Sequence, residues 1–107
     1  MAATPESKVK ADVRKILNSM DVYHFMPPGN GFGRAGIPDI VGCMDGMFIA
    51  IECKAGKGKT TALQERELEW IADAGGFAFV ARENNLDELK QLLQEKKDGR
   101  RNEQAVA

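Results

Sequence analysis

Two acidic residues and a lysine flank a predicted tight turn and have the side chains that phosphodiester chemistry needs. Asp39 follows a proline, and thirteen residues later comes the run Glu52-Cys53-Lys54. Between them lies Asp45-Gly46 with apolar runs on both sides, a pattern that predicts a hairpin with a two-residue turn. In a hairpin centred on that turn the numbers of facing residues sum to 91, so Asp39 faces Glu52.

The expected pair of carboxylates is unfavourable unless something neutralises it. Facing residues of an antiparallel pair have Cβ atoms about 4.5–5.5 Å apart, and two acids at that spacing repel each other. A divalent cation between Asp39 and Glu52 reverses the sign of the interaction. Lys54 projects from the face of Glu52, because strand side chains alternate. The pattern predicts a metal-dependent site. The alternative is that the two acids face each other by accident and that solvent relieves their repulsion. A register slip of one residue would separate the two side chains.

Two further polar residues are predicted on inward-facing positions of helices. Glu6 extends the apolar stripe of the first helix by one turn, where an unpaired acid is costly. Gln64 precedes Leu68 and Ile71 on the inward side of a later helix. Each has a structural alternative: the helix dipole favours an acid in the first turn, and Gln64 completes a capping box with Thr61.

The composition is that of one ordinary soluble domain. The chain has 107 residues, of which 43% are hydrophobic and 29% charged, and its net charge is −1. A polyanion partner must therefore be bound by a local cluster of basic residues rather than by overall charge. Cys43 and Cys53 should point to opposite faces of the hairpin, so we expect free thiols and a cytoplasmic location. No apolar run approaches the length of a membrane span.

Apolar periodicity and turn residues predict the element order α-β-β-β-α-β-α, a small α/β sheet with helices on both sides. We expect one domain over residues 1–97 and a disordered polar tail over 98–107. Asn85, with Glu88 three residues later, should cap the last helix. The expected elements are a helix beginning at Thr4-Pro5, a strand at 22–26, a glycine- and proline-rich loop at 27–38, hairpin strands at 39–44 and 47–53, a helix from Thr61 to about Ala74, a strand at 77–82 and a helix from Asn85 to Lys97.

Three other possible binding motifs are excluded by their sequence context. Residues 31–36 match GxGxxG, but a proline and a strand follow, whereas the dinucleotide fingerprint requires a helix there. Residues 56–60 suggest a phosphate loop, yet the position that should hold its first glycine is Cys53. A zinc site from His24, Cys43 and Cys53 would need all three side chains on one face, which strand alternation forbids.

Together, the runs Gly36-Ile37-Pro38-Asp39 and Ile51-Glu52-Cys53-Lys54, with Gln64, resemble the PD-(D/E)xK nuclease superfamily. More narrowly, the chain resembles the VRR-NUC (virus-type replication-repair nuclease) domain in its stand-alone phage and bacterial form. The resemblance spans roughly residues 4 to 95. It implies a restriction-endonuclease-like core, dependence on Mg²⁺ or Mn²⁺, and a homodimer that acts as an endonuclease on branched DNA such as Holliday junctions.

These considerations assign roles to individual residues. The expected catalytic residues are Asp39, Glu52, Lys54, Gln64 and Glu6. The expected metal ligands are Asp39, Glu52, the main-chain carbonyl of Cys53 and, in an outer shell or at a second ion, Glu6.

Arg34, Lys57 and Lys59 lie on loops beside the site and are candidate phosphate contacts, with solvated loop charge as the alternative. Trp70, Phe25 and the leucines of the last helix could line a dimer interface or belong to the core. Two functions other than a nuclease remain open: a catalytically silent DNA-junction binding module, and a small phosphate- or nucleotide-binding protein built on the glycine-rich loop.

Overall fold

The computed structural model describes residues 4–28 and 33–106, so part of the predicted glycine-rich loop, residues 29–32, lies outside the described residues. The predicted element order is confirmed. Within the described residues, every helix is too short or too polar to cross a membrane. The elements are α1 (Pro5–Ser19), β1 (Tyr23–Phe25), β2 (Ile40–Met44), β3 (Met47–Cys53), α2 (Ala62–Asp73), β4 (Phe77–Ala81) and α3 (Leu86–Val106).

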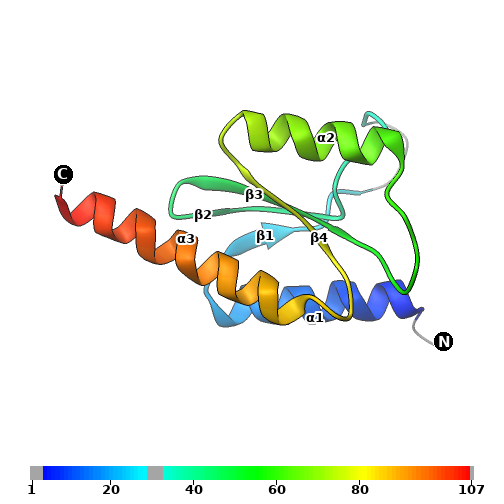
Figure 1. Ribbon diagram of the computed structural model, residues 1–107, viewed down its shortest axis with the longest axis horizontal. Helices are drawn as coiled ribbons and strands as arrows, with labels where there is room; N and C mark the ends of the chain where they lie inside the picture. The colour runs from blue at the N-terminus through cyan, green and yellow to red at the C-terminus, as the bar shows by residue number, and fades with distance from the viewer. Residues whose placement is uncertain (1–3, 29–32, 107) are drawn as a thin grey trace.

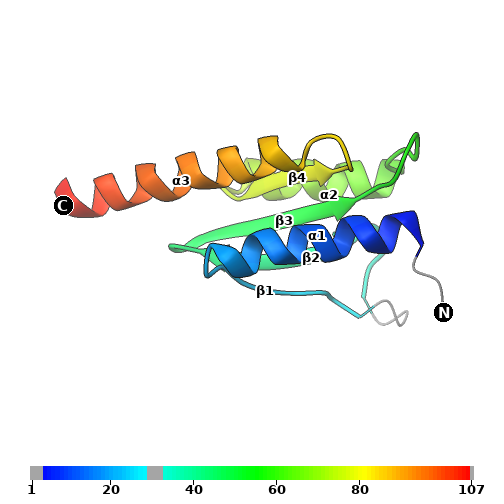
Figure 2. The same ribbon diagram turned by 90° about the horizontal axis from the view of Figure 1, so that it is seen from below.

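The four strands form one mixed sheet in the order β1-β2-β3-β4. The first three strands are antiparallel neighbours, and β4 runs parallel to β3. Helix α2 lies on one face of the sheet, against β3 and β4, while α1 and α3 lie on the other face (Figure 1). Figure 2 shows α1 and α3 side by side across that second face. The expected covering of both faces is therefore present.

The predicted hairpin and its register are confirmed. Val41 pairs with Ala50 and Met44 with Met47, so facing numbers sum to 91 as expected. Asp45 and Gly46 both have positive φ, 49° and 83°, as a type I′ turn requires. Because the turn fixes which residues face each other, this two-residue sequence determines what meets at the far end of the hairpin.

The main core lies between the sheet and the α1–α3 layer. It consists mainly of apolar residues from alternate positions of the strands and from one stripe each of α1 and α3. Leu89 and Leu93 of α3 are fully buried in it, so these leucines are core residues and not an interface. The other members are Val9, Val13, Leu17, Met20, Val22, Ile40, Met44, Met47, Ile49, Ile51, Cys53, Phe77 and Ala81.

Two predictions about the last helix are wrong. Helix α3 ends at Val106 and not near Lys97, so the residues expected to form a disordered tail are helical as far as Val106. Lys97 and Arg100 explain part of this, because they bond to the carbonyls of Met20 and Asp45 at 2.7 and 2.6 Å. The side chain of Asn85 does not cap the helix: its Oδ1 accepts from the Arg82 amide and its Nδ2 donates to Val80, at the end of β4.

Candidate active site

The carboxyl groups of Asp39 and Glu52 lie in hydrogen-bonding contact. Asp39 precedes β2 and Glu52 is the penultimate residue of β3, one step beyond the last ladder pair, Ile40 with Ile51. The Oδ2 atom of Asp39 also accepts a hydrogen bond of 2.8 Å from the backbone amide of Cys53. This side-chain hydrogen bond continues the contact between the two strands beyond their last backbone pair. It holds Asp39 beside Glu52, as the register predicted from the sequence requires.

Glu52 is almost completely buried and incompletely bonded. It is 2% exposed, and its Oε2 atom has no hydrogen-bond partner. Burial is the main reason that its pKa rises to about 8; the hydrogen bond and the negative charge of Asp39 raise it further, while Lys54 opposes the rise. A carboxylate that is ionised only above neutral pH, with one oxygen unsatisfied, is a group that a cation would stabilise.

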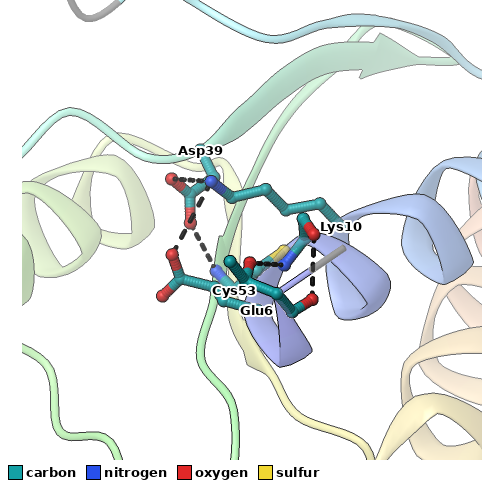
Figure 3. Close-up of polar contacts among 6 residues, drawn as sticks. Glu6, Lys10, Asp39 and Cys53 are labelled. Carbon is teal, nitrogen blue, oxygen red and sulfur yellow. Dashed lines mark hydrogen bonds and ion pairs between the residues drawn. The ribbon is translucent and has the colours of Figure 1, made fainter. Parts of the chain in front are cut away.

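Lys10 is a member of this cluster that the sequence analysis did not identify. From α1 its Nζ atom lies 3.7 Å from Asp39 Oδ1 and 3.7 Å from Glu6 Oε2. Figure 3 shows the lysine reaching from the helix to the Asp39 carboxylate, which the Cys53 amide also contacts. The spacing of Glu6 and Lys10, four residues apart on one helix, predicts only that these two side chains are neighbours, and not that Lys10 reaches Asp39.

Three other predicted residues surround the acid pair. Glu6 is close enough for its charge to raise the pKa of Glu52, and Lys54 is close enough for its charge to lower that pKa. Cys53, buried on the opposite face of β3, supplies its backbone amide to Asp39. Burial first, and then the charges of Asp39 and Glu52, raise the pKa of the Cys53 thiol to about 12, so the thiol stays neutral.

Gln64 has the helix-capping role that was the structural alternative to a place in the catalytic site. Its Oε1 accepts from the Thr61 amide at 2.9 Å, and its own amide donates to Thr61 Oγ1 at 3.2 Å, which completes the predicted capping box. The N-terminus of α2 in turn packs tightly on the loop that carries Asp39. A Cβ added to Gly36, which has φ of 87°, would lie 2.5 Å from the Leu63 carbonyl oxygen.

Arg34 is held against α2. Its Nε donates to Oε1 of Glu67 at 2.7 Å, and its guanidinium lies 5.2 Å from the centre of the Trp70 ring. Glu67 is only 2% exposed, and its Oε2 atom has no hydrogen-bond partner. The sequence analysis did not identify Glu67, because a glutamate among other charged helix residues gives no sign that it is buried. The pair ties the loop before Asp39 to α2.

Lys57 and Lys59 are exposed on the loop between β3 and α2. Residues after β4 hold this loop: both Glu83 carboxylate oxygens accept from the Gly56 amide at 3.0 Å, and Arg82 Nη1 donates to the Gly58 carbonyl at 2.7 Å. Hydrogen bonds from its own amide and from Gly56 lower the pKa of Glu83. The two lysines are thus presented on a braced loop directly after Lys54.

The donors at the strand ends fit a small hard cation. Within the described part of the chain, no three His, Cys, Asp or Glu side chains are gathered closely enough to form a metal site on their own. Mg²⁺ does not require such a group, because it usually keeps several waters and takes one or two carboxylates. The site offers two carboxylates, Asp39 and Glu52, and the Oε2 atom of Glu52 has no other partner. The Cys53 carbonyl would add a third oxygen ligand.

A mixed four-stranded sheet with two acids and a lysine at the ends of its central hairpin defines the restriction-endonuclease-like class of nuclease domains. Residues 12–104 match the family model described as archaeal Holliday junction resolvase (hjc), and the chain belongs to that family. The matched range includes Asp39, Glu52 and Lys54 but begins after Glu6 and Lys10.

A solved structure described as a VRR_NUC domain protein has the same fold. It superposes with a TM-score of 0.62 over 87% of this chain and 88% of that chain, at 22% sequence identity. No curated protein matches the chain in sequence.

Proposed function

We propose that the chain is a Mg²⁺- or Mn²⁺-dependent endonuclease that hydrolyses phosphodiester bonds in branched DNA, with Holliday junctions as the substrate class. Family membership supports the substrate class. The observation that carries the chemistry is the contact between Asp39 and the buried Glu52, whose Oε2 atom has no partner. We also propose the VRR-NUC type in its stand-alone phage or bacterial form; the fold match supports the VRR-NUC fold alone.

Asp39, Glu52 and the Cys53 carbonyl would hold the metal ion, which when bound supplies Lewis acidity and a water acidic enough to give hydroxide. Lys54 directly follows Cys53 and lies two residues after Glu52, so its ammonium would orient the attacking water or stabilise charge that develops on the phosphate. Glu6 would complete the outer shell. The hydrogen bonds of Gln64 use Oε1 and the backbone amide. We therefore propose its Nε2 as a donor to a phosphate, and the second lone pair of Oε1 as an acceptor from Lys54.

Arg34, Lys57 and Lys59 remain proposed contacts to the DNA backbone. The braced loop supports this role for the two lysines, since it presents them next to Lys54. For Arg34 the support is weaker, because its guanidinium is already bonded to Glu67 and stacked on Trp70. Each true phosphate contact should reduce the slope of log affinity against log salt by about 1 when it is removed.

We also propose a homodimer, because two sites are needed to cut two strands symmetrically. Exposed aromatic side chains support this proposal and suggest where the partner would bind. Tyr23, Phe25 and Phe48 are 70%, 47% and 48% exposed on the sheet, and Trp70 on α2 is 58% exposed. Tyr23 and Phe48 both pair with Cys43, so they form a row across three strands. Sedimentation of wild type beside a Tyr23→Ser/Phe48→Ser variant tests the dimer.

The enzymatic proposal is tested by a cleavage panel on duplex, flap and four-way junction DNA with Mg²⁺, Mn²⁺ or chelator. We expect the wild type to cleave the junction only with a metal ion. Asp39→Ala, Glu52→Ala and Lys54→Ala should each lose at least about 10²-fold in rate while remaining folded by circular dichroism. Lys90→Ala, an exposed substitution on α3, is the matched control. A wild type that leaves every substrate intact with both metals contradicts the proposal.

A catalytically silent junction-binding module is the alternative. Such a module would bind four-way junctions equally well with chelator and in the Asp39→Ala variant. A gel-shift titration of wild type and Asp39→Ala, with and without Mg²⁺, separates the two functions, because only a nuclease site should couple binding to the metal ion.

A further inference from the structure

The Lys10 ammonium lies close to the Asp39 carboxylate, the group that would also bind a metal ion. It is 3.7 Å from Asp39 Oδ1, while the other oxygen of that carboxylate is bonded to the Cys53 amide. The second partner of Lys10 is Glu6, also at 3.7 Å. The lysine side chain is 26% exposed, so it is partly withdrawn from water and its charge is only partly screened.

The neighbouring lysine of the same helix shows that this placement is specific. Lys8 is 74% exposed and forms an ordinary surface pair with Asp12, one turn along the helix, at 3.0 Å. Lys10 instead leaves its own helix to reach an acid that precedes β2. The negative charges of Asp39 and Glu6 both act on Glu52 in this small region. Without a cation these acids repel, and Lys10 offsets that repulsion.

We propose that Lys10 sets the affinity of the site for its divalent cation, because its ammonium and the ion compete for the same carboxylate charge. The inference rests on the proposed metal dependence. In the metal-free protein Lys10 neutralises Asp39 and Glu6 and stabilises the cluster. When a divalent ion binds, the ammonium is a like charge only a few ångströms from it and must move away or weaken the binding. Lys10 is therefore a residue that tunes metal affinity, not a metal ligand.

Isothermal titration calorimetry with Mn²⁺, on the full chain stripped of metal and without DNA, tests this inference. Wild type is compared with Lys10→Met, which keeps the length of the side chain without its charge, and with Lys8→Met as the matched control. We expect Lys10→Met to bind Mn²⁺ roughly tenfold more tightly, the effect of removing one nearby positive charge that is partly screened by solvent. Lys8→Met and the charge-conserving Lys10→Arg should bind as the wild type does.

Thermal unfolding gives an independent readout. In chelator, Lys10→Met should unfold at a lower temperature than wild type, because Asp39 and Glu6 then lack the ammonium that pairs with both of them. Saturating Mn²⁺ should then raise its Tm by more than it raises the Tm of wild type or Lys8→Met. Lys10→Gln serves as a second neutral variant if Lys10→Met does not fold.

The possible results separate this inference from the proposed function. Wild type that binds Mn²⁺ while Lys10→Met binds it equally or more weakly overturns the role of Lys10 alone. Tighter binding by Lys10→Arg as well as by Lys10→Met also overturns it, because charge would then not be the cause. A wild type that binds no Mn²⁺ overturns the metal dependence on which both depend.

Discussion

The carboxyl groups of Asp39 and Glu52 are in hydrogen-bonding contact at the open end of the β2–β3 hairpin, each six positions from the turn residues Asp45 and Gly46 that set their register. One of the two groups is nearly fully buried and has an unsatisfied oxygen. An arrangement of this kind costs stability unless a proton or a cation compensates it. The stability of the metal-free protein should therefore report directly on the site.

The first prediction concerns pH. The pKa of Glu52 is raised from 4.5 to about 8, so between these values the unfolded chain has released a proton that the folded chain retains. The unfolded state then binds fewer protons, and stability falls as pH rises through this window, by a few kcal/mol at most. Glu52→Gln lacks this dependence, so in chelator it should become more stable than wild type near pH 8.

Denaturant unfolding of both proteins between pH 5 and pH 8.5 measures the difference. Mg²⁺ should restore wild-type stability at pH 8 and leave Glu52→Gln unchanged. Parallel pH curves for the two proteins would show that Glu52 is ionised in the folded state at all these pH values, contrary to this interpretation.

The second prediction concerns Arg34 and Glu67. Arg34→Met leaves a buried carboxylate without its donor and should cost about 1–3 kcal/mol in the free energy of unfolding. Arg34→Met/Glu67→Met removes the stranded charge and should recover part of that loss. Arg66→Met, an exposed neighbour on α2, should change stability by less than about 0.5 kcal/mol. An Arg34→Met variant with full stability but weaker junction binding would instead assign Arg34 to the DNA backbone.

The third prediction concerns the loop between β3 and α2. Arg82→Met removes the donor to the Gly58 carbonyl, so residues 56–59 should exchange their amide hydrogens faster and be cut sooner by trypsin at Lys57 and Lys59. Because these bonds are exposed, the global free energy of unfolding should change by less than about 1 kcal/mol. Lys90→Met is the control. Unchanged exchange in the loop would mean that the braces from Arg82 do not restrain it.

The sequence alone determined the central part of this protein. Asp45-Gly46 selects a two-residue turn, the turn fixes the register, and strand alternation then brings Asp39 to Glu52 and sends Cys53 to the opposite face. The capping box of Thr61 and Gln64 and the order of the elements follow from similarly local rules. These features could be predicted because each depends on residues close together in the chain.

Other features depended on how distant segments pack. Lys10 reaches an acid 29 positions away, and Arg34 pairs with a glutamate 33 positions away, so no local pattern identifies either contact. Asn85 has the residue type of a helix cap, but the end of β4 offers its side chain other partners. Helix α3 continues past Lys97 because carbonyls of Met20 and Asp45 anchor it there. Charged side chains on helices can face water or a partner, and only the tertiary packing decides between the two.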